Sequence, residues 1–123
     1  MATTKLNKEL IIRFVNELNA VKKERHHIEQ FVADEVLVQH FLFFDHLFPG
    51  NELLIDELTA EGNRVILRTR MKGRHDGTLK GISATHRSIE YPMVFGFEIE
   101  RKKIIHHWLL ADQAKLLEQL RMT

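Results

Sequence analysis

The chain has 123 residues, of which 44% are apolar, and this length is enough for a single domain, residues 1–123, with a hydrophobic core. Eighteen Lys and Arg residues against 17 Asp and Glu leave a net charge of +1, which excludes a strong overall attraction to nucleic acid or to an anionic membrane. Cysteine is absent, so disulfides and thiolate metal sites are excluded as well.

The N-terminal third predicts helices. Its polar start, MATTKLNKEL, lacks the apolar core of a signal peptide, and no apolar run is long enough to span a bilayer, so we expect a soluble, cytoplasmic protein. Apolar residues at spacings of three and four predict a first helix, which Thr3 or Thr4 can cap. The stripe consists of Leu6, Leu10, Phe14, Leu18 and Val21.

Two shorter helices are expected next. The first of them carries Ile28, Phe31 and Val32, and the second runs from Val36 to Phe48 with Asp34 as its N-cap. It ends before Pro49-Gly50, a pair that does not continue a helix.

The spacing of apolar residues then changes to that of strands. A first strand is predicted to begin at residues 53–58. The clearest strand is Val65–Met71, with apolar residues on one face and arginines on the other. Further strands are expected at 89–99 and 104–111, followed by a short helix at 113–120. Helices first and strands joined by short turns afterwards predict an α+β domain, with helices packed on one face of a curved, mainly antiparallel sheet.

Two details of the strands lead to expectations about their position in the sheet. Pro92 lacks the N–H that a ladder needs, which favours an edge or a bulge for the strand at 89–99. The strand at 104–111 is apolar on both of its faces, which favours a central position.

The chain resembles the SnoaL-like polyketide cyclase family of the nuclear-transport-factor-2-like superfamily. The resemblance rests on FFDHLFPG at 43–50, ELTAEGNRVILRTRMKGRHDG at 57–77, LKGISAT at 79–85 and KKIIHHWLLADQAKLLEQL at 102–120. It implies a conical fold with an interior cavity, a homodimer formed through the sheet, and a ring-closing aldol reaction on a polyketide ester without a metal or an organic cofactor. The superfamily also contains isomerases, dehydratases and non-catalytic binding proteins, so the shared fold leaves the chemistry open.

The sequence departs from the family at two positions. An ungapped comparison places the general-base aspartate of characterised cyclases at Leu109 and a histidine that they use at Phe95. Neither Leu nor Phe transfers protons, so another group would have to supply the acid–base chemistry.

His75 and Asp112 are the first candidates for this role. His75 continues the apolar phase of its strand across Gly73, so it is expected to point into the cavity as a general acid or base. The alternative is a histidine that only holds the glycine-rich loop. Asp112 follows an apolar segment that would make its carboxylate a better base, and the alternative is an N-cap of the last helix.

Adjacent histidines at 106 and 107 must face opposite sides of a strand, and we take His107 as the third catalytic candidate. No Cys/His cluster or His-Glu-x-x-His pattern is present, so no metal site is expected. The residues expected to contact a ligand in the cavity are His40, Phe44, Met71, Arg87, Tyr91, Phe95 and Trp108.

Two hypotheses for the function follow. In the first, the protein binds a hydrophobic small molecule with carbonyl or ester groups and catalyses a cofactor-free cyclisation, isomerisation or related proton transfer. In the second, it is a non-catalytic ligand-binding or dimerisation module with the same cavity, which the residues at 95 and 109 favour.

Overall fold

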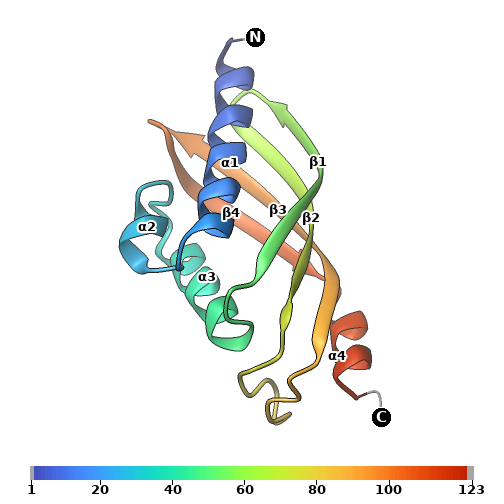
Figure 1. Cartoon of the computed structure of the whole chain (residues 1–123). Coiled ribbons are helices and arrows are strands. Elements are labelled where there is room, and N and C mark those ends of the chain that lie inside the picture. The colour runs from blue at the N-terminus through green and yellow to red at the C-terminus, as the bar shows by residue number, and fades with distance from the viewer. Residues whose placement is uncertain (1, 122–123) are drawn as a thin grey trace.

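The computed structural model describes residues 2–121, in which three helices precede a four-stranded sheet and a fourth helix follows it (Figure 1). The helices are α1 (Ala2–Ala20), α2 (Arg25–Glu29), α3 (Glu35–Leu47) and α4 (Gln113–Arg121). The strands are β1 (Glu52–Glu61), β2 (Arg64–Arg74), β3 (Ser88–Glu100) and β4 (Lys103–Ala111). The predicted α+β class and order of elements are confirmed.

The sheet has the order β1-β2-β3-β4 with every neighbouring pair antiparallel. Alternation puts the odd-numbered residues of β2 and β3 on the inner face, where they are buried, and the even-numbered residues on the outer face. The register shifts between Ile55 and Glu57 and between Glu98 and Ile99, and irregularities of this kind bend strands. The sheet consequently curves around the helices on its inner side (Figure 1).

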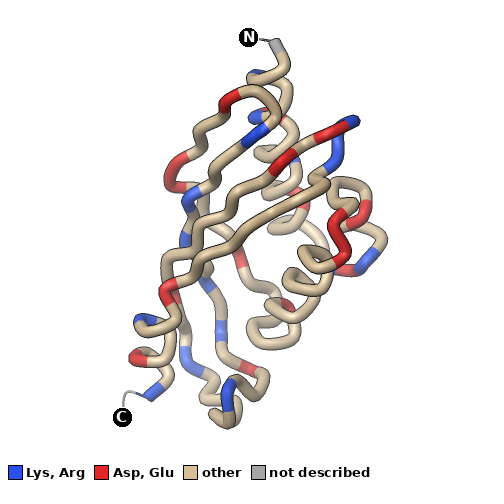
Figure 2. The backbone as a smooth tube through the Cα atoms, turned by 180° about the vertical axis from the view of Figure 1, so that it is seen from behind, with Lys and Arg blue, Asp and Glu red and all other residues tan. Residues whose placement is uncertain are grey.

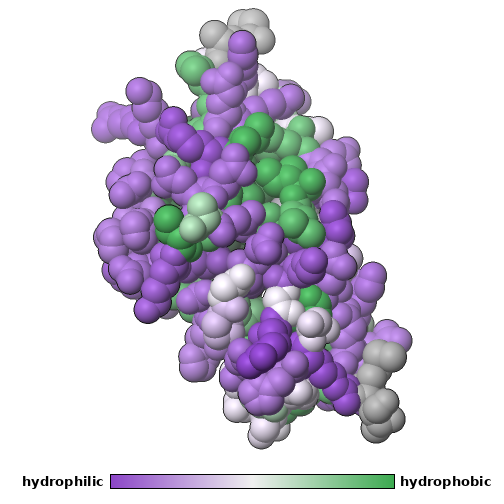
Figure 3. Space-filling model, viewed as in Figure 1, coloured by the Kyte–Doolittle hydropathy of each residue, from purple (hydrophilic) through white to green (hydrophobic). Residues whose placement is uncertain are grey.

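Helix α1 lies across the inner side of the sheet and buries one face there (Figure 1). Its buried residues are Leu10, Ile11, Phe14, Val15 and Leu18, whereas Leu6 and Val21, which were expected in the same stripe, are exposed. Thr3 and Thr4 already belong to the helix, so neither is its cap. Figure 3 shows a hydrophobic area beside α1, where the helix leaves part of β1 uncovered.

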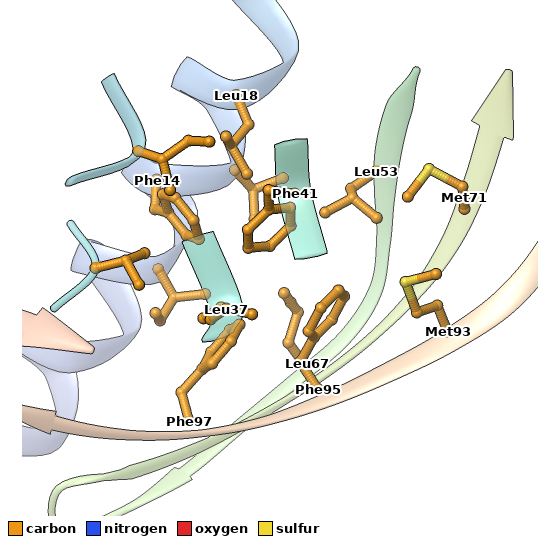
Figure 4. Close-up of a cluster of buried hydrophobic side chains, with 14 of the residues drawn as sticks. Phe14, Leu18, Leu37, Phe41, Leu53, Leu67, Met71, Met93, Phe95 and Phe97 are labelled. Atoms are coloured by element: carbon orange, nitrogen blue, oxygen red, sulfur yellow. The ribbon is translucent and has the colours of Figure 1, made fainter. Parts of the chain in front are cut away.

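The core lies between α1, α3 and the inner face of the sheet (Figure 4). Phe41 of α3 stacks on Phe95 of β3, with ring centroids 5.7 Å apart, and meets Phe14 of α1 edge to face at 5.5 Å. All three side chains are almost completely buried. Burial of an aromatic side chain of this size contributes roughly 2–3 kcal/mol, so this cluster fixes α3 on the sheet.

Helix α3 begins and ends as its sequence predicts. The side chain of Asp34 accepts a hydrogen bond from the N–H of Leu37 at 3.3 Å, which is the expected N-cap. After the helix, Gly50 adopts a positive φ of 72°, a conformation that costs glycine little. The chain then turns into β1.

Two expectations about the sheet are wrong. β3, which contains Pro92, is a central strand, and β4 lies at the edge. Pairing of β3 with β4 begins at Met93, and the carbonyl of Pro92 accepts from the N–H of Asp112. The nitrogen of Pro92 faces the same side as its carbonyl, beyond the end of β4, so the missing N–H removes no ladder bond.

The apolar pattern of β4 on both faces does not come from a central position. On its inner face Ile104 is buried and Leu109 and Ala111 pack against the core, and the segment after α2 pairs with its free edge through Val32 and Ile104. Its outer face carries Trp108 and Leu110, which are 47% and 69% exposed. Within residues 2–121, no helix is long and apolar enough to cross a membrane.

Candidate functional site

A cavity of about 400 Å³ lies between the second half of α3, the inner face of β3 and β4, and the start of α4. Its wall is mainly apolar, and its polar side chains are His40, Lys80, Tyr91, His107 and Gln113. It reaches the surface at Lys80, which is exposed, and at Phe43, which is 48% exposed. A concave, mostly apolar site of this size with few polar groups is the usual form of a small-molecule site.

The cavity lies beside the contact of Phe41 with Phe95, between the second half of α3 and the inner face of β3 and β4. Phe41 fills the space between α3 and β3, whereas β4 presents His107, Leu109 and Ala111 on its inner face next to a space that α3 does not fill. The alternation of β4 therefore decides which of its two adjacent histidines enters the site. His107 pairs with the inward residue Phe97 and lines the cavity, while His106 pairs with Glu98 on the outer phase.

His107 is bound to Asp34. Its Nδ1 lies 2.6 Å from Oδ2 of Asp34, a short distance typical of a hydrogen bond to a carboxylate. Both side chains are shielded from solvent, with exposed fractions of 10% for His107 and 14% for Asp34. Because an ionised carboxylate only accepts, Nδ1 is the donor in this hydrogen bond, and in the neutral form of the imidazole the lone pair is on Nε2. No hydrogen bond from the described residues reaches Nε2.

Asp34 joins two parts of the fold through its two oxygens. Oδ1 accepts from the N–H of Leu37 at the start of α3, and Oδ2 contacts His107 on β4. Burial alone would raise the pKa of Asp34, but the hydrogen bonds from His107 and Leu37 and the charge of His107 hold it below its usual value. Asp34 is therefore ionised at neutral pH and keeps the imidazole in one orientation.

His40 lies next to this pair on α3. Its ring stands edge to face with that of His107, at a centroid distance of 5.4 Å, and is nearly parallel to Phe44 one turn later on the helix, at 6.2 Å. Burial, together with the charge of His107, lowers the pKa of His40, and Asp34 opposes this shift. His40 is therefore a neutral imidazole in the cavity wall at neutral pH.

His75 does not line the cavity, contrary to expectation. It is completely buried, and its Nδ1 accepts a hydrogen bond from the backbone N–H of Thr85 at 3.1 Å. Its backbone bonds to Arg87 and His86, so it ties together the two ends of the loop at 76–86. Nε2 is buried without a partner among the described residues. The chain passes close to Phe48 at Gly73, where a Cβ would lie 3.0 Å from the Cβ of Phe48, and the ring of His75 lies 6.2 Å from that of Phe48 between centroids.

Asp112 is exposed, contrary to the expected desolvated carboxylate. Its side chain accepts from the N–H of Lys115 at 3.0 Å, so it caps α4, the alternative that the sequence left open. An exposed carboxylate that caps a helix does not suit a base acting inside the cavity.

Four of the residues expected to contact a ligand lie elsewhere. Met71 and Phe95 are completely buried in the core beneath the helices (Figure 4). Trp108 belongs to the outer phase of β4, where its ring lies against Gly96. Arg87 donates to the last carbonyls of α4, those of Gln119 and Leu120, through Nη1. The remaining predicted contacts, His40, Phe44 and Tyr91, line the cavity.

Three polar residues of the site, Asp34, Lys80 and Gln113, were not identified from the sequence. Asp34 was interpreted only as a helix cap, and nothing in the sequence relates it to a histidine 73 residues later. Lys80 lies at the mouth of the cavity, where its Nζ contacts Oε1 of Gln113 on α4. The glycine-rich loop that carries Lys80 is held to α3, because Asp76 and Gly77 both donate to the carbonyl of Leu47.

The cavity wall offers no set of side chains that suits a metal. Within residues 2–121, the one cluster of three side chains spaced to hold an ion is Glu24, His26 and His27, which lies on the surface near α2 and outside the cavity. The polar groups of the cavity are instead two imidazoles, a phenol, an amide and an ammonium group, which suit proton transfer and hydrogen bonding.

Comparison with known proteins gives a family model and a set of similar structures. The model of the SnoaL-like polyketide cyclases matches residues 10–120. No curated protein matches the sequence. A candidate SnoaL-like polyketide cyclase from Jannaschia sp. CCS1 has a TM-score of 0.86 at 17% identity, with 100% of this chain and 96% of that chain covered.

Two further structures illustrate the range of similar proteins. A SnoaL-like polyketide cyclase from Agrobacterium tumefaciens has a TM-score of 0.78 at 14% identity and covers 93% of this chain and 97% of its own. AclR, a candidate hydroxylase from Streptomyces galilaeus, has a TM-score of 0.82 at 21% identity, and the match covers 95% of this chain and 82% of AclR. At these identities the structures establish the fold and leave the reaction open.

Proposed function

The chain belongs to the SnoaL-like polyketide cyclase family, and we propose that it binds a hydrophobic carbonyl compound in its cavity, where His107 removes a proton from the bound compound and returns it at another atom. The observation that supports this proposal is the short hydrogen bond between His107, in the cavity wall, and the shielded carboxylate of Asp34. We propose no metal or organic cofactor for this reaction.

The reaction follows from the orientation of the imidazole. Nε2 of neutral His107 takes a proton from a carbon next to a carbonyl group, and the electron pair of the broken C–H bond moves into the enolate. The ionised carboxylate of Asp34 stabilises the imidazolium that forms. Return of the proton to another atom of the enolate gives an isomer. Attack of the enolate carbon on a second carbonyl, with the proton going to its oxygen, closes a ring.

His107 also accounts for the departure from the family. Leu109, at the position of the usual general base, lines the cavity but has no ionisable group. His107 is two residues earlier on β4 and therefore on the same face of the strand. We propose that the base has moved along the strand by one inward position.

Proton exchange tests this function without knowledge of the natural substrate. Hydrophobic ketones and β-keto esters are incubated with the protein in D₂O, and incorporation of deuterium next to the carbonyl is followed by NMR. We expect catalysed exchange for members of this panel and a loss of at least ~100-fold in His107→Asn. The matched control is His106→Asn, which changes the adjacent histidine on the outer phase. Equal exchange in His107→Asn and the parent protein would refute the role of His107.

A non-catalytic binding module is the second candidate, and the apolar side chains of Leu109 and Phe95 favour it. In that case panel compounds bind in the cavity, detected by shifts of the His40 and His107 resonances, and no member undergoes exchange. Binding with exchange contradicts this alternative.

We also propose a homodimer formed through the outer face of the sheet. Residues 91–97 of β3 and 104–111 of β4 contain no Lys, Arg, Asp or Glu, and Figure 2, which views the molecule from behind, has no charge on these stretches. Ile66, Trp108 and Leu110 are exposed on this face, with exposed fractions of 47%, 47% and 69%. Apolar groups of this size gathered on one face are typical of an interface.

Sedimentation at micromolar concentration tests the dimer. We expect twice the chain mass of 14.5 kDa for the parent protein and a monomer for Leu110→Lys, because a charge would be buried in the interface. Val36→Lys, at an exposed apolar residue of α3 away from this face, is the control. A monomeric parent protein is incompatible with the proposal.

A further inference from the structure

The two imidazoles of the cavity differ in their surroundings. His107 is hydrogen-bonded to the carboxylate of Asp34, whereas the ring nitrogens of His40 have no hydrogen-bond partner among the described residues. The ring of His40 is nevertheless held in place by its contacts with Phe44 and His107. Environments that separate two neighbouring titratable groups in this way assign them different roles in acid–base chemistry.

We infer that His40 is a second catalytic residue, a neutral hydrogen-bond donor to the carbonyl oxygen of the substrate while His107 removes the proton from the adjacent carbon. This inference rests on the proposed function and adds the group that stabilises the negative charge of the enolate. A neutral imidazole carries one N–H, so His40 can donate without itself losing or gaining a proton.

Charge supports this division of roles. The positive charge that His107 acquires when it takes the proton opposes protonation of His40, so His40 stays neutral during the reaction. Lys80 is the other cationic side chain at the cavity, but it lies at the exposed mouth and contacts Gln113. His40 is therefore the polar group next to the base that can meet the carbonyl oxygen, three bonds away from the hydrogen that His107 removes.

The arrangement also narrows the substrate class. Two neutral nitrogen groups suit an uncharged ketone or β-keto ester whose reacting segment is H–C–C=O, and not a carboxylate at the reacting position. The C–H bond breaks, an N–H bond forms on His107, and the C=O bond becomes a C–O⁻ bond that His40 stabilises. Returning the proton restores both residues, so no co-reactant is needed.

Tyr91 is a competing donor, because its phenol also lines the cavity and is not hydrogen-bonded within the described residues. Burial raises the pKa of Tyr91, so its hydroxyl keeps its proton. The experiment therefore compares Tyr91→Phe with variants of His40.

The probe is 2-naphthol, whose oxygen on a planar ring imitates an enol and can accept a hydrogen bond from His40. Its isostere without this oxygen acceptor is 2-fluoronaphthalene. Calorimetry gives the dissociation constants of both for the parent protein, His40→Gln, His40→Phe and Tyr91→Phe. We expect the preference for 2-naphthol to fall about tenfold in His40→Phe, the size of one neutral hydrogen bond. It is expected to survive in His40→Gln, which retains an N–H donor, and in Tyr91→Phe.

The deuterium exchange assay supplies the second readout. His40→Phe is expected to slow exchange on a panel ketone with little change in its dissociation constant, because the hydrogen bond strengthens only as the enolate forms. His40→Gln restores most of the rate. An unchanged naphthol preference in His40→Phe, its loss in Tyr91→Phe instead, or failure of 2-naphthol to bind the parent protein would overturn the inference. If no ketone exchanges deuterium but the preference for 2-naphthol still depends on His40, the proposed reaction is wrong and the hydrogen-bonding role of His40 stands.

Discussion

Asp34 determines the site at the scale of single residues. One oxygen caps α3 and the other holds His107, so the position of a helix end and the tautomer of a histidine depend on the same carboxylate. Asp, Ser, Thr and Asn are comparable as N-caps, but among these residues Asp alone carries two charged acceptor oxygens. The two roles of Asp34 can therefore be separated by substitution.

Replacing Asp34 with Ser tests this separation. Ser remains a good N-cap, so the free energy of unfolding is expected to fall by no more than about 1 kcal/mol. Its single hydroxyl cannot also bind His107, and we expect ¹⁵N NMR of His107 to change from a dominant Nδ1–H tautomer to a mixture. Asp112→Ser, at the cap of α4, is the matched control and should leave the His107 spectrum unchanged. An unaltered tautomer in Asp34→Ser contradicts the role of the carboxylate.

The titration of His40 gives a second prediction for a single residue. Its pKa is expected below its ordinary value of 6.5, because burial and then the charge of His107 disfavour protonation. Replacing His107 with Gln removes the second cause, so the pKa of His40 should rise relative to the parent protein. NMR titration of the ring protons measures both values, with His106→Gln as the control on the opposite face of β4. A lower pKa of His40 in His107→Gln would contradict this account.

At the scale of elements, strand alternation and glycine positions arrange the site and its surroundings. The phase of β4 sends His107 and Leu109 inward and Trp108 and Leu110 outward, so one strand contributes both to the cavity and to the proposed interface. The loop at 76–86 passes close to the end of α3, where a Cβ on Gly77 would lie 2.7 Å from the carbonyl oxygen of His46. The lack of a side chain at Gly77 allows the loop to reach the cavity mouth.

Gly96 makes a testable contribution to the outer face. A Cβ at this position would lie 2.0 Å from Cε2 of Trp108, so Gly96→Ala must displace the indole. We expect a loss of about 1–3 kcal/mol in the free energy of unfolding, from urea titration, and a shift of the tryptophan emission. The chain has a single Trp, so the emission reports this site alone. Thr59→Ala, exposed on β1, should change neither quantity, and an unchanged emission in Gly96→Ala would show that the ring does not rest on the glycine.

At the scale of the whole molecule, the cone is closed where α1 and α3 cover the sheet and open where β4 leads into α4 (Figure 1). Aromatic packing of Phe14, Phe41 and Phe95 fills the closed part. The imidazoles lie at the boundary between this core and the cavity, where burial and access to a ligand are both available. A site of this kind needs the assembled fold, because His107 of β4 meets Asp34, 73 residues earlier in the chain, and His40 of α3.

The stability of the folded protein is expected to fall in acid. The hydrogen bond from Arg25 lowers the pKa of Glu35 to about 2, and arginine hydrogen bonds also lower the pKa values of Asp56 and Asp76. In Asp34, burial raises the pKa, but the hydrogen bonds from His107 and Leu37 outweigh it and leave the pKa lowered. Because these carboxyl groups have lower pKa values in the folded than in the unfolded chain, the unfolded chain binds more protons in acid. The stabilisation from these groups is therefore present above about pH 4 and is lost as the pH falls toward 2.

Urea midpoints measured between pH 6 and pH 2 check this prediction. The midpoint should decrease across this range, and Glu35→Gln should reduce the decrease at its lower end. High salt should weaken the exposed contributions, because Arg25 and Glu35 are open to solvent. A midpoint that rises toward pH 2 would contradict the assignment.

The sequence by itself determined the element order, the α+β class and the inward phase of β2 and β3, whereas the inward phase of β4 was decided by the structure. These features depend on local periodicity and on residues such as Asp34 and Pro49, which act within a few positions of themselves. Only the tertiary structure decided that β4 is an edge strand, that His75 is buried away from the cavity, and that Asp34 meets His107. These outcomes depend on which segments pack together across long stretches of chain, and local periodicity carries no information about such contacts.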